Sequence, residues 1–178
     1  MTEVRRFVCD DMFRFNTVNL DPLTETYNLG FYLQYLAVWP NYFSVCESSS
    51  GELMGYVMGK AEGRGEEWHG HVTCLTVTPT YRRLGLANQM MDLLERVSEH
   101  IYDGYFVDLF VRKSNEVAIG MYRKLGYTVY RRVLGYYSAS VDADEEDAYD
   151  MRKALPRDVT KKSVIPLDHP VLPEDVYS

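Results

Sequence analysis

Apolar residues follow the pattern of a strand in some segments and the spacing of a helix face in others, and one stretch of the chain joins a strand pattern directly to a helix pattern. Residues 72–77 are apolar and β-branched, which predicts a buried strand, and Pro79 ends it because proline cannot donate to a ladder. Apolar residues then recur at the spacing of one helix face, at Leu86, Met90, Leu93, Leu94 and Val97. The pattern therefore predicts a strand, a tight loop and an amphipathic helix in direct succession.

The rest of the pattern predicts further strands and helices in alternation. Strands are expected at residues 4–8, 42–47, 53–61, 68–77, 105–111, 128–137 and 148–155. Helices are expected from Asp10 or Asp11 to Val18, at 29–38, from about 84 to 100, and from a Ser114 cap to Gly126 with apolar positions at Val117, Met121 and Leu125. This order is typical of the α/β (α+β) class, with a mixed sheet and helices on both faces.

We expect one domain over residues 1–155, followed by an extended tail. Residues 138–147 are polar and acidic, which predicts a loop before the last strand. From residue 156 to residue 178 the composition shifts to Pro, Lys and Asp, so this stretch is expected to be the tail.

The helix expected at 29–38 is unusually aromatic. Its own residues and its neighbours include Tyr27, Phe31, Tyr32, Tyr35 and Trp39, which are more rings than one internal face can bury. Two explanations remain open. Either the rings form a deep aromatic core, or some of them line a cleft or meet another protein.

Composition and charge exclude several classes of protein. The chain has 178 residues and a net charge of -7, which argues against nonspecific nucleic-acid binding. No apolar run reaches the ~18–20 residues needed to span a bilayer, and the N-terminus lacks the apolar core of a signal peptide. The cysteines are three in number and form no Cys-x-x-Cys pair. This usage fits a reducing compartment, so we expect a cytoplasmic protein with no membrane partner.

The loop between the strand and the amphipathic helix has the composition of an anion site. Its residues are Arg82, Arg83, Leu84, Gly85, Leu86 and Ala87. The first N–H groups of a helix have no internal partners and carry the positive end of its dipole. Gly85 would let a phosphate approach the backbone without a Cβ in the way. The alternative is a surface turn with two solvated arginines.

Two motifs resemble the GNAT acetyltransferases. The loop from Arg82 to Ala87 resembles their acetyl-CoA pyrophosphate loop, and residues 114–127 resemble the Asn, Ala, Tyr and Leu-Gly-Tyr pattern that follows their fifth strand. The resemblance implies a mostly antiparallel seven-stranded sheet and acetyl-CoA as cosubstrate. It also implies that Asn115 contacts the CoA arm and that Tyr122 lies near the thioester sulfur, where it would protonate the leaving thiolate. Backbone N–H groups of Leu75 and Val77 would polarise the thioester carbonyl.

A more specific resemblance covers nearly the whole chain. Segments 21–27, 32–36, 55–60, 67–73, 106–112 and 147–153 resemble the catalytic subunits of the N-terminal acetyltransferase B (NatB) complex. That family acetylates the α-amino group of nascent chains beginning Met-Asp, Met-Glu, Met-Asn or Met-Gln. Its active form is a heterodimer with a large helical-repeat auxiliary subunit, which also anchors it to ribosomes. The resemblance implies the same partners for this chain, with no direct binding to nucleic acid.

The NatB resemblance also assigns the peptide site. It implies that Glu25 and Tyr27 wall the peptide cleft, that His71 and Thr73 face the second residue of the substrate, and that Tyr136 and Tyr137 bind the peptide backbone. A histidine donor suits both a carboxylate and an amide oxygen, which explains acceptance of all four second residues. The base remains open between water held by Glu25 and water held by His71.

Three alternatives compete with this assignment. His69 and His71 point to one side of a strand, but two histidines without a third ligand make a poor zinc site, so no metal is expected. A GNAT enzyme acting on lysine or on a small amine is the second alternative. A diverged, non-catalytic CoA-binding subunit is the third, because the turn at 63–67 is short and because Cys74 and Gly135 depart from the family pattern.

Overall fold

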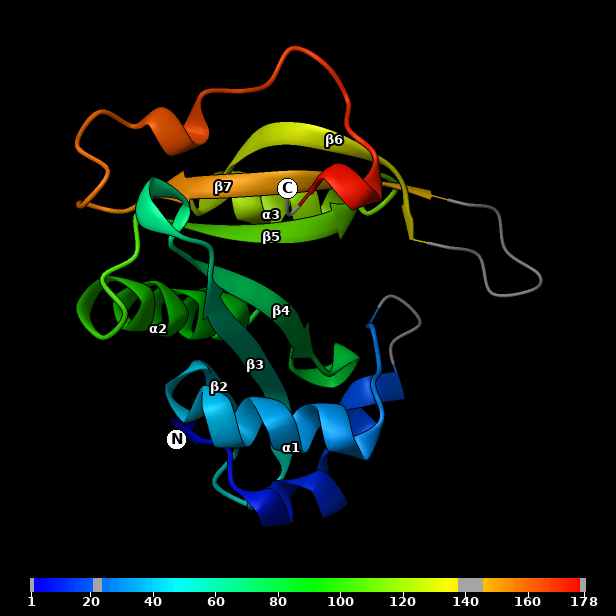
Figure 1. Cartoon of the computed structure of the whole chain (residues 1–178). Helices are drawn as coiled ribbons and strands as arrows, with labels where there is room; N and C mark the ends of the chain where they lie inside the picture. Colours follow the sequence, from blue (N-terminus) through cyan, green and yellow to red (C-terminus); the bar gives the residue numbers. More distant parts are fainter. Residues whose placement is uncertain (1, 21–23, 138–145, 177–178) are drawn as a thin grey trace. The chain divides into compact units, whose positions relative to one another are not determined.

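The computed structural model describes residues 2–20, 24–137 and 146–176, and these residues form seven strands and three α-helices (Figure 1). The strands are β1 (Glu3–Arg6), β2 (Phe43–Glu47), β3 (Leu53–Glu62), β4 (His69–Val77), β5 (Phe106–Arg112), β6 (Thr128–Tyr137) and β7 (Glu146–Ala154). The helices are α1 (Leu29–Val38), α2 (Leu86–His100) and α3 (Glu116–Lys124). The number of strands is the number that the sequence predicts.

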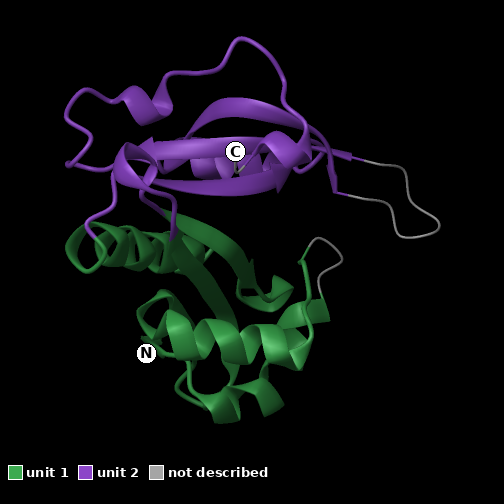
Figure 2. Cartoon of the chain, viewed as in Figure 1, with its two compact units in different colours: residues 1–61, 70–102 green, residues 62–69, 103–178 purple. Residues whose placement is uncertain are grey.

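The chain divides into two compact units (Figure 2). Unit 1 consists of residues 1–61 and 70–102, and unit 2 of residues 62–69 and 103–178. The strand order is β1-β2-β3-β4 in unit 1 and β5-β7-β6 in unit 2. The pairs β1–β2, β2–β3, β5–β7 and β7–β6 are all antiparallel, as a mostly antiparallel sheet requires. Among the described residues, no helix is both long enough and apolar enough to cross a membrane.

Helix α1 has the bounds that the sequence predicts. Asn28 caps it, since its side-chain oxygen accepts the N–H of Phe31 at 3.0 Å. Its last residue is Val38, and Pro40 two residues later cannot continue the helix. Both ends are therefore fixed by local chemistry.

The aromatic residues around α1 form a core rather than a free surface. Tyr32 and Tyr35 are buried in a cluster with Phe7, Phe15, Phe43, Tyr56 and Met58. Tyr27, Phe31 and Trp39 pack on that cluster and are partly buried. The exposed apolar residues of the helix are instead Leu29, Leu33 and Val38, of which Leu29 and Leu33 lie one turn apart on the same side. The core explanation is therefore correct for Tyr32 and Tyr35.

Helices α1 and α2 cover opposite faces of strand β3. Met58 belongs to the cluster under α1. A Cβ built on the next residue, Gly59, would lie 3.0 Å from Leu94 of α2. Successive side chains of a strand point to opposite faces, so the expected helices on both faces are confirmed for unit 1.

The first expected helix is not an α-helix. Two 3-10 segments, Cys9–Phe13 and Phe15–Leu20, take its place. Asp11 explains the tight turn, because its carboxylate accepts the Val8 N–H at 2.9 Å and binds Arg5 at 2.8 Å. Burial opposes the charge of Asp11, but these hydrogen bonds outweigh it and lower the pKa of the carboxyl.

Two details of unit 2 differ from the sequence prediction. Strand β7 begins at Glu146 rather than at Ala148, and residues 138–145 of the expected loop lie outside the described residues, as do residues 21–23. Asn115, not Ser114, caps α3, because its side-chain oxygen accepts the N–H of Ala118 at 3.2 Å. Val117, an expected apolar-face residue, is 87 % exposed, and the helix buries Ile119 and Tyr122 instead.

Residues 167–176 follow the outer edge of β6. The N–H of Leu167 donates to Tyr130, that of Val171 to Arg132, and that of Leu134 to Val171, at 2.7 to 2.9 Å. Arg131 also donates to the carbonyl of Val176 at 3.0 Å. The extended part of the chain after residue 155 is thus hydrogen-bonded to the strand in the described structure.

Candidate functional site

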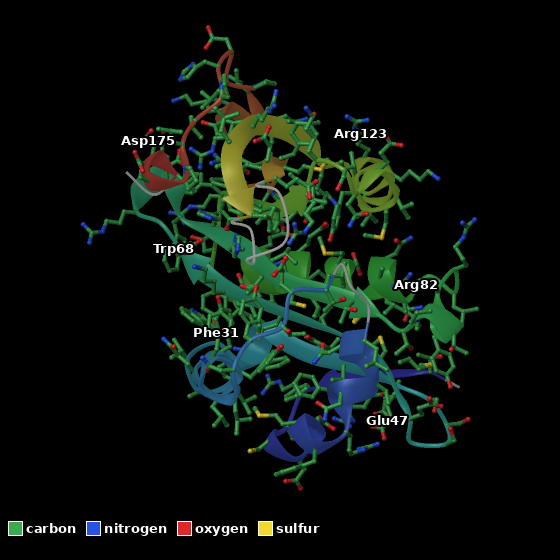
Figure 3. The ribbon with its side chains drawn as sticks, turned by 90° about the vertical axis from the view of Figure 1, so that its right-hand side faces the viewer. Phe31, Glu47, Trp68, Arg82, Arg123 and Asp175 are labelled. Carbon is green, nitrogen blue, oxygen red and sulfur yellow. The ribbon has the colours of Figure 1, made fainter. Side chains whose placement is uncertain are left out.

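The loop before α2 has the backbone that an anion site needs. Gly85 is the N-cap of α2 and has φ +79°, which is left-handed, and Arg83 is also left-handed with φ +67°. Arg82 donates from Nε to the carbonyl of Val77 at 3.1 Å, which ties the loop to the end of β4. Figure 3 shows Arg82 at this point of unit 1.

The space above this loop is open. A Cβ built on Gly85 would meet nothing within 4 Å, and the side chain of Leu84 is 61 % exposed. The first N–H groups of α2 have no acceptor within the helix, and they lie at the positive end of its dipole. Together with the guanidinium groups of Arg82 and Arg83, they could bind a pyrophosphate.

Strand β4 carries four of the predicted site residues at alternate positions. Thr73, Leu75 and Val77 are partly exposed, whereas the residues between them, Cys74 and Thr76, are buried. His71 belongs to the same alternate set and is 7 % exposed. An extended strand points alternate residues to one side, so these side chains share that side.

Glu25 and Tyr27 lie on a loop that is attached to β4 and α1. Oγ1 of Thr24 lies 2.9 Å from Oγ1 of Thr76 on β4, and the ring of Tyr27 stacks on Phe31 of α1 at 4.2 Å. Glu25 is exposed, and its charge acts on the buried thiol of Cys74. Unit 1 therefore brings Glu25 and Tyr27 to the strand that carries His71 and Thr73.

Cys74 is not a candidate nucleophile. Burial, with a smaller contribution from Glu25, raises the pKa of its thiol to about 11, against the effect of its hydrogen bond to Tyr56. A thiol with such a pKa has almost no thiolate near neutral pH. This departure from the family pattern therefore adds no reactive group.

The remaining predicted residues belong to unit 2. Asn115 uses its side-chain oxygen for the α3 cap, which leaves its amide NH₂ as the group that could donate to a CoA arm. Tyr122 lies seven residues later on α3, on the same side of the helix, and is buried. Asn115 thus lies at the start of α3 and Tyr122 on its buried side, and their contacts with acetyl-CoA stay predictions.

Tyr136 and Tyr137 flank one residue of β5. The ring of Tyr136 stacks on Phe110 at 4.6 Å, and the hydroxyl of Tyr137 donates to the Phe110 carbonyl at 3.3 Å. The guanidinium of Arg112 lies 4.1 Å above the Tyr137 ring. The two tyrosines are thus held firmly on the β5 side of unit 2.

The side chain of His69 is held by a hydrogen bond, a stacked ring and two neighbouring acids. Its Nδ1 lies 2.6 Å from the Glu67 carbonyl, and its ring stacks on Phe106 at 4.5 Å. Its Nε2 lies 3.4 Å from Asp108 and 3.7 Å from Glu62. Burial lowers the pKa of His69, but the surrounding acids outweigh burial and raise it overall. Glu62 and His69 could offer a cation two ligand atoms, and the sequence pattern did not predict the contribution of Glu62.

Buried hydroxyls that the sequence pattern does not predict support the predicted site. Thr73 donates to the hydroxyl of Tyr35 at 3.0 Å, and the N–H of Tyr27 donates to the hydroxyl of Tyr32 at 3.2 Å. The available signal was a tyrosine or threonine in an otherwise apolar segment. That signal is weak, because such residues are common in cores.

Comparison with known proteins gives one family throughout. The family model described as Acetyltransferase (GNAT) family matches residues 8–127. N-alpha-acetyltransferase 20 of Dictyostelium discoideum is 65% identical over 98% of each chain. The N-terminal acetyltransferase B complex catalytic subunit NAA20 of Arabidopsis thaliana is 60% identical and covers 99% of this chain and 98% of its own. The crystal structure of Chaetomium thermophilum Naa20 in complex with a bisubstrate analogue has a TM-score of 0.89 and 43% identity, with 99% of this chain and 100% of that chain covered.

Proposed function

This chain belongs to the GNAT acetyltransferase family and, within it, to the NatB catalytic subunits, and from that premise we propose how its residues transfer an acetyl group and to which peptides. The donor is acetyl-CoA, and the acceptor is the α-amino group of chains beginning Met-Asp, Met-Glu, Met-Asn or Met-Gln. The observation that carries the proposal is the similarity to NatB catalytic subunits along almost the full length of both chains.

Acetyl-CoA binds with its pyrophosphate on the loop from Arg82 to Ala87. The left-handed backbone at Gly85 and the open space above it support this placement. The amide NH₂ of Asn115 donates to the pantetheine arm, because the cap of α3 already occupies the side-chain oxygen. The related Chaetomium structure was solved with a bisubstrate analogue, which supports adjoining cofactor and peptide sites in this family.

The second residue of the peptide is recognised by His71 and Thr73. A ring N–H of His71 donates to the carboxylate of Asp or Glu, or to the amide oxygen of Asn or Gln. Leucine at this position offers no acceptor, so its complex would lack the hydrogen bond from His71, which is worth roughly 0.5–1.5 kcal/mol. Glu25 and Tyr27 line one side of the peptide, and Tyr136 and Tyr137 bind its backbone.

The reaction is a direct transfer. The α-amine has a pKa of ~7.7–8.0, so a useful fraction is neutral near pH 7 and only a weak base is needed. Water held by Glu25 or His71 removes the proton as the nitrogen attacks the thioester carbonyl. The N–H groups of Leu75 and Val77 stabilise the oxyanion. The C–S bond then breaks, and the hydroxyl of Tyr122 gives its proton to the thiolate.

The partner subunit docks on α1. A catalytic subunit of a NatB complex has an auxiliary partner, and we propose that this partner is a large helical-repeat protein. The exposed apolar residues Leu29 and Leu33, which lie one turn apart on the same side of α1, support the placement, because adjoining exposed apolar side chains mark protein–protein contacts. Through this auxiliary subunit the enzyme associates with ribosomes in the cytoplasm, where nascent N-termini appear.

The test is acetyl transfer by the complex with its auxiliary subunit co-expressed. The four acceptor peptides begin Met-Asp, Met-Asn, Met-Leu and Ser-Glu, and each is also tested with a blocked N-terminus and an internal lysine. We expect turnover only with free Met-Asp and Met-Asn.

Turnover of blocked peptides would move the acceptor to lysine. Turnover of Met-Leu at the rate of Met-Asp would refute recognition of the second residue by His71. Acetyl-CoA binding without any turnover would favour a non-catalytic subunit.

A further inference from the structure

Residues 24–27, called the Glu25 loop below, are attached to the rest of unit 1 at both ends. At one end, Oγ1 of Thr24 is hydrogen-bonded to Oγ1 of Thr76 on β4 at 2.9 Å. At the other end, the N–H of Tyr27 donates to the hydroxyl of Tyr32 on α1 at 3.2 Å. Glu25 itself lies between these two attachments and is exposed.

The attachment at Tyr32 continues into a buried network. Tyr32 lies close enough to Tyr56 of β3 to raise the pKa of Tyr56, whose side chain is fully buried. The hydroxyl of Tyr56 donates to the side-chain oxygen of Asn19 at 2.7 Å, and the thiol of Cys74 lies 3.5 Å from the same hydroxyl. The network therefore joins the segment before the loop, strands β3 and β4, and helix α1.

The network keeps one protonation state. Burial, followed by the neighbouring Cys74 and Tyr32, raises the pKa of Tyr56 far above its ordinary value. Its hydroxyl thus stays protonated at every working pH and can always donate. The buried polar atoms are satisfied by one another, which makes such a network rigid and specific.

We propose that Tyr32 and Thr76 are positioning residues for peptide binding, because they fix the two ends of the Glu25 loop. This inference rests on the proposed roles of Glu25 and Tyr27, neither of which Tyr32 or Thr76 replaces. A loop exchanging among conformations would present the Glu25 carboxylate and the Tyr27 ring to the peptide for only part of the time.

Tyr32→Phe removes one hydroxyl and keeps the ring that packs on Phe15 at 5.1 Å. Tyr42→Phe is the matched control. Tyr42 is equally buried in unit 1, and its hydroxyl donates to Ser98 at 2.9 Å, so this change also deletes one buried hydrogen bond. The control removes the same chemistry without touching the Glu25 loop.

Thr76 gives a second and independent pair of variants. Thr76→Val keeps the shape of the side chain and removes the hydroxyl that meets Thr24, whereas Thr76→Ser keeps the hydroxyl. Serine should therefore rescue what valine loses. This pair also tests the proposal if Tyr32→Phe impairs folding.

Two measurements on the complex with its auxiliary subunit distinguish anchoring from catalysis. Amide hydrogen exchange of a fragment covering residues 24–28 reports whether the loop is anchored and does not require turnover. Steady-state kinetics with a Met-Asp peptide and with acetyl-CoA report the consequence.

We expect Tyr32→Phe and Thr76→Val to speed exchange in this fragment and to lower kcat/KM for the peptide about three- to tenfold, the size of one lost hydrogen bond. The KM for acetyl-CoA should change less than about twofold, with Tyr42→Phe and Thr76→Ser near the unsubstituted protein.

Exchange at the unsubstituted rate in both variants would overturn the anchoring. Faster exchange with peptide kinetics equal to those of Tyr42→Phe would overturn the positioning role. Absence of transfer by the unsubstituted complex would instead refute the proposed function, and the exchange data would still decide whether the loop is anchored.

Discussion

Gly85→Ala tests two roles of Gly85 in the pyrophosphate loop. The glycine adopts a left-handed backbone conformation, and its missing Cβ leaves the pyrophosphate free to approach the backbone. Gly85 has φ +79°, and a left-handed conformation costs a residue with a Cβ roughly 1–2 kcal/mol. The smaller entropy of the unfolded alanine chain returns about 0.4–1 kcal/mol. Nothing lies within 4 Å of the added Cβ, so no steric clash adds to this. The net loss of stability is thus about 1 kcal/mol, or roughly 2–4 °C in Tm for a chain of this size.

The effect on acetyl-CoA should be larger than the effect on stability. The methyl group would occupy the open space where the pyrophosphate approaches the N-terminus of α2. Each charge-assisted hydrogen bond from a backbone N–H is worth about 1.5–3 kcal/mol, so loss of one raises the Kd for acetyl-CoA about tenfold or more. Calorimetric titration with acetyl-CoA measures this, and thermal melting measures the stability term.

Two further variants make the test specific. Gly85→Asn should keep most of the stability, since asparagine tolerates the left-handed region, yet it should lose the same affinity. Gly65→Ala is the matched control, because Gly65 has φ +57° and nothing within 4 Å of its Cβ. It should lose stability only. Unchanged acetyl-CoA affinity in Gly85→Ala, or an equal loss in Gly65→Ala, would refute the placement of the pyrophosphate.

Three other changes have definite expected outcomes. The folded pKa of His69 is raised, so its stabilising contribution is complete below the unfolded pKa of ~6.5 and is lost as pH rises through the folded value. His69→Gln should therefore flatten the fall in unfolding free energy above pH ~6.5 in denaturant titrations, and an unchanged slope would contradict this. Arg83→Gly removes the strain of a left-handed backbone at a residue with a Cβ, so thermal melting should show unchanged stability or a gain of up to ~1 kcal/mol. The KM for acetyl-CoA should rise, because the guanidinium is lost. A large loss of stability would contradict this. Leu33→Glu should reduce co-purification with the auxiliary subunit at unchanged acetyl-CoA affinity. Val117→Glu on α3, at a position that is more exposed (87 % against 40 % for Leu33), should not reduce it. Co-purification of Leu33→Glu at the level of Val117→Glu would remove α1 from the interface.

The sequence predicts the elements whose ends are set by local chemistry. Helix α1 is one example, since Asn28 and Pro40 lie beside its ends and no distant contact is needed. The α3 cap is less certain from sequence, because Ser114 and Asn115 are both good caps and only the packed structure selects between them. Val117 is exposed because the side of α3 that is buried carries Ile119 and Tyr122, and the sequence pattern alone does not select that side.

The sequence pattern does not predict contacts between residues that are distant along the chain. Asp11 makes a 3-10 turn through Arg5, and this partner is visible only after β1 is in place. The predicted site residues lie on the elements expected for them, because their motifs carry the resemblance. Their supports, Tyr32 and Thr76, resemble ordinary core residues until the hydrogen bonds are seen.

The segment along β6 has a consequence for solubility. In the order β5-β7-β6 this strand is the outermost, and an uncovered outer strand presents unpaired N–H and C=O groups to any other extended chain. The backbone N–H groups of Leu167 and Val171 donate hydrogen bonds to the carbonyls of Tyr130 and Arg132, so these carbonyls are already paired. Removal of residues 167–176 would delete none of the proposed site residues. It would expose the unpaired backbone groups of β6 as an edge strand that another chain could pair with. The final stretch of the chain therefore acts against self-association, and its loss would first appear as turbidity that grows with protein concentration.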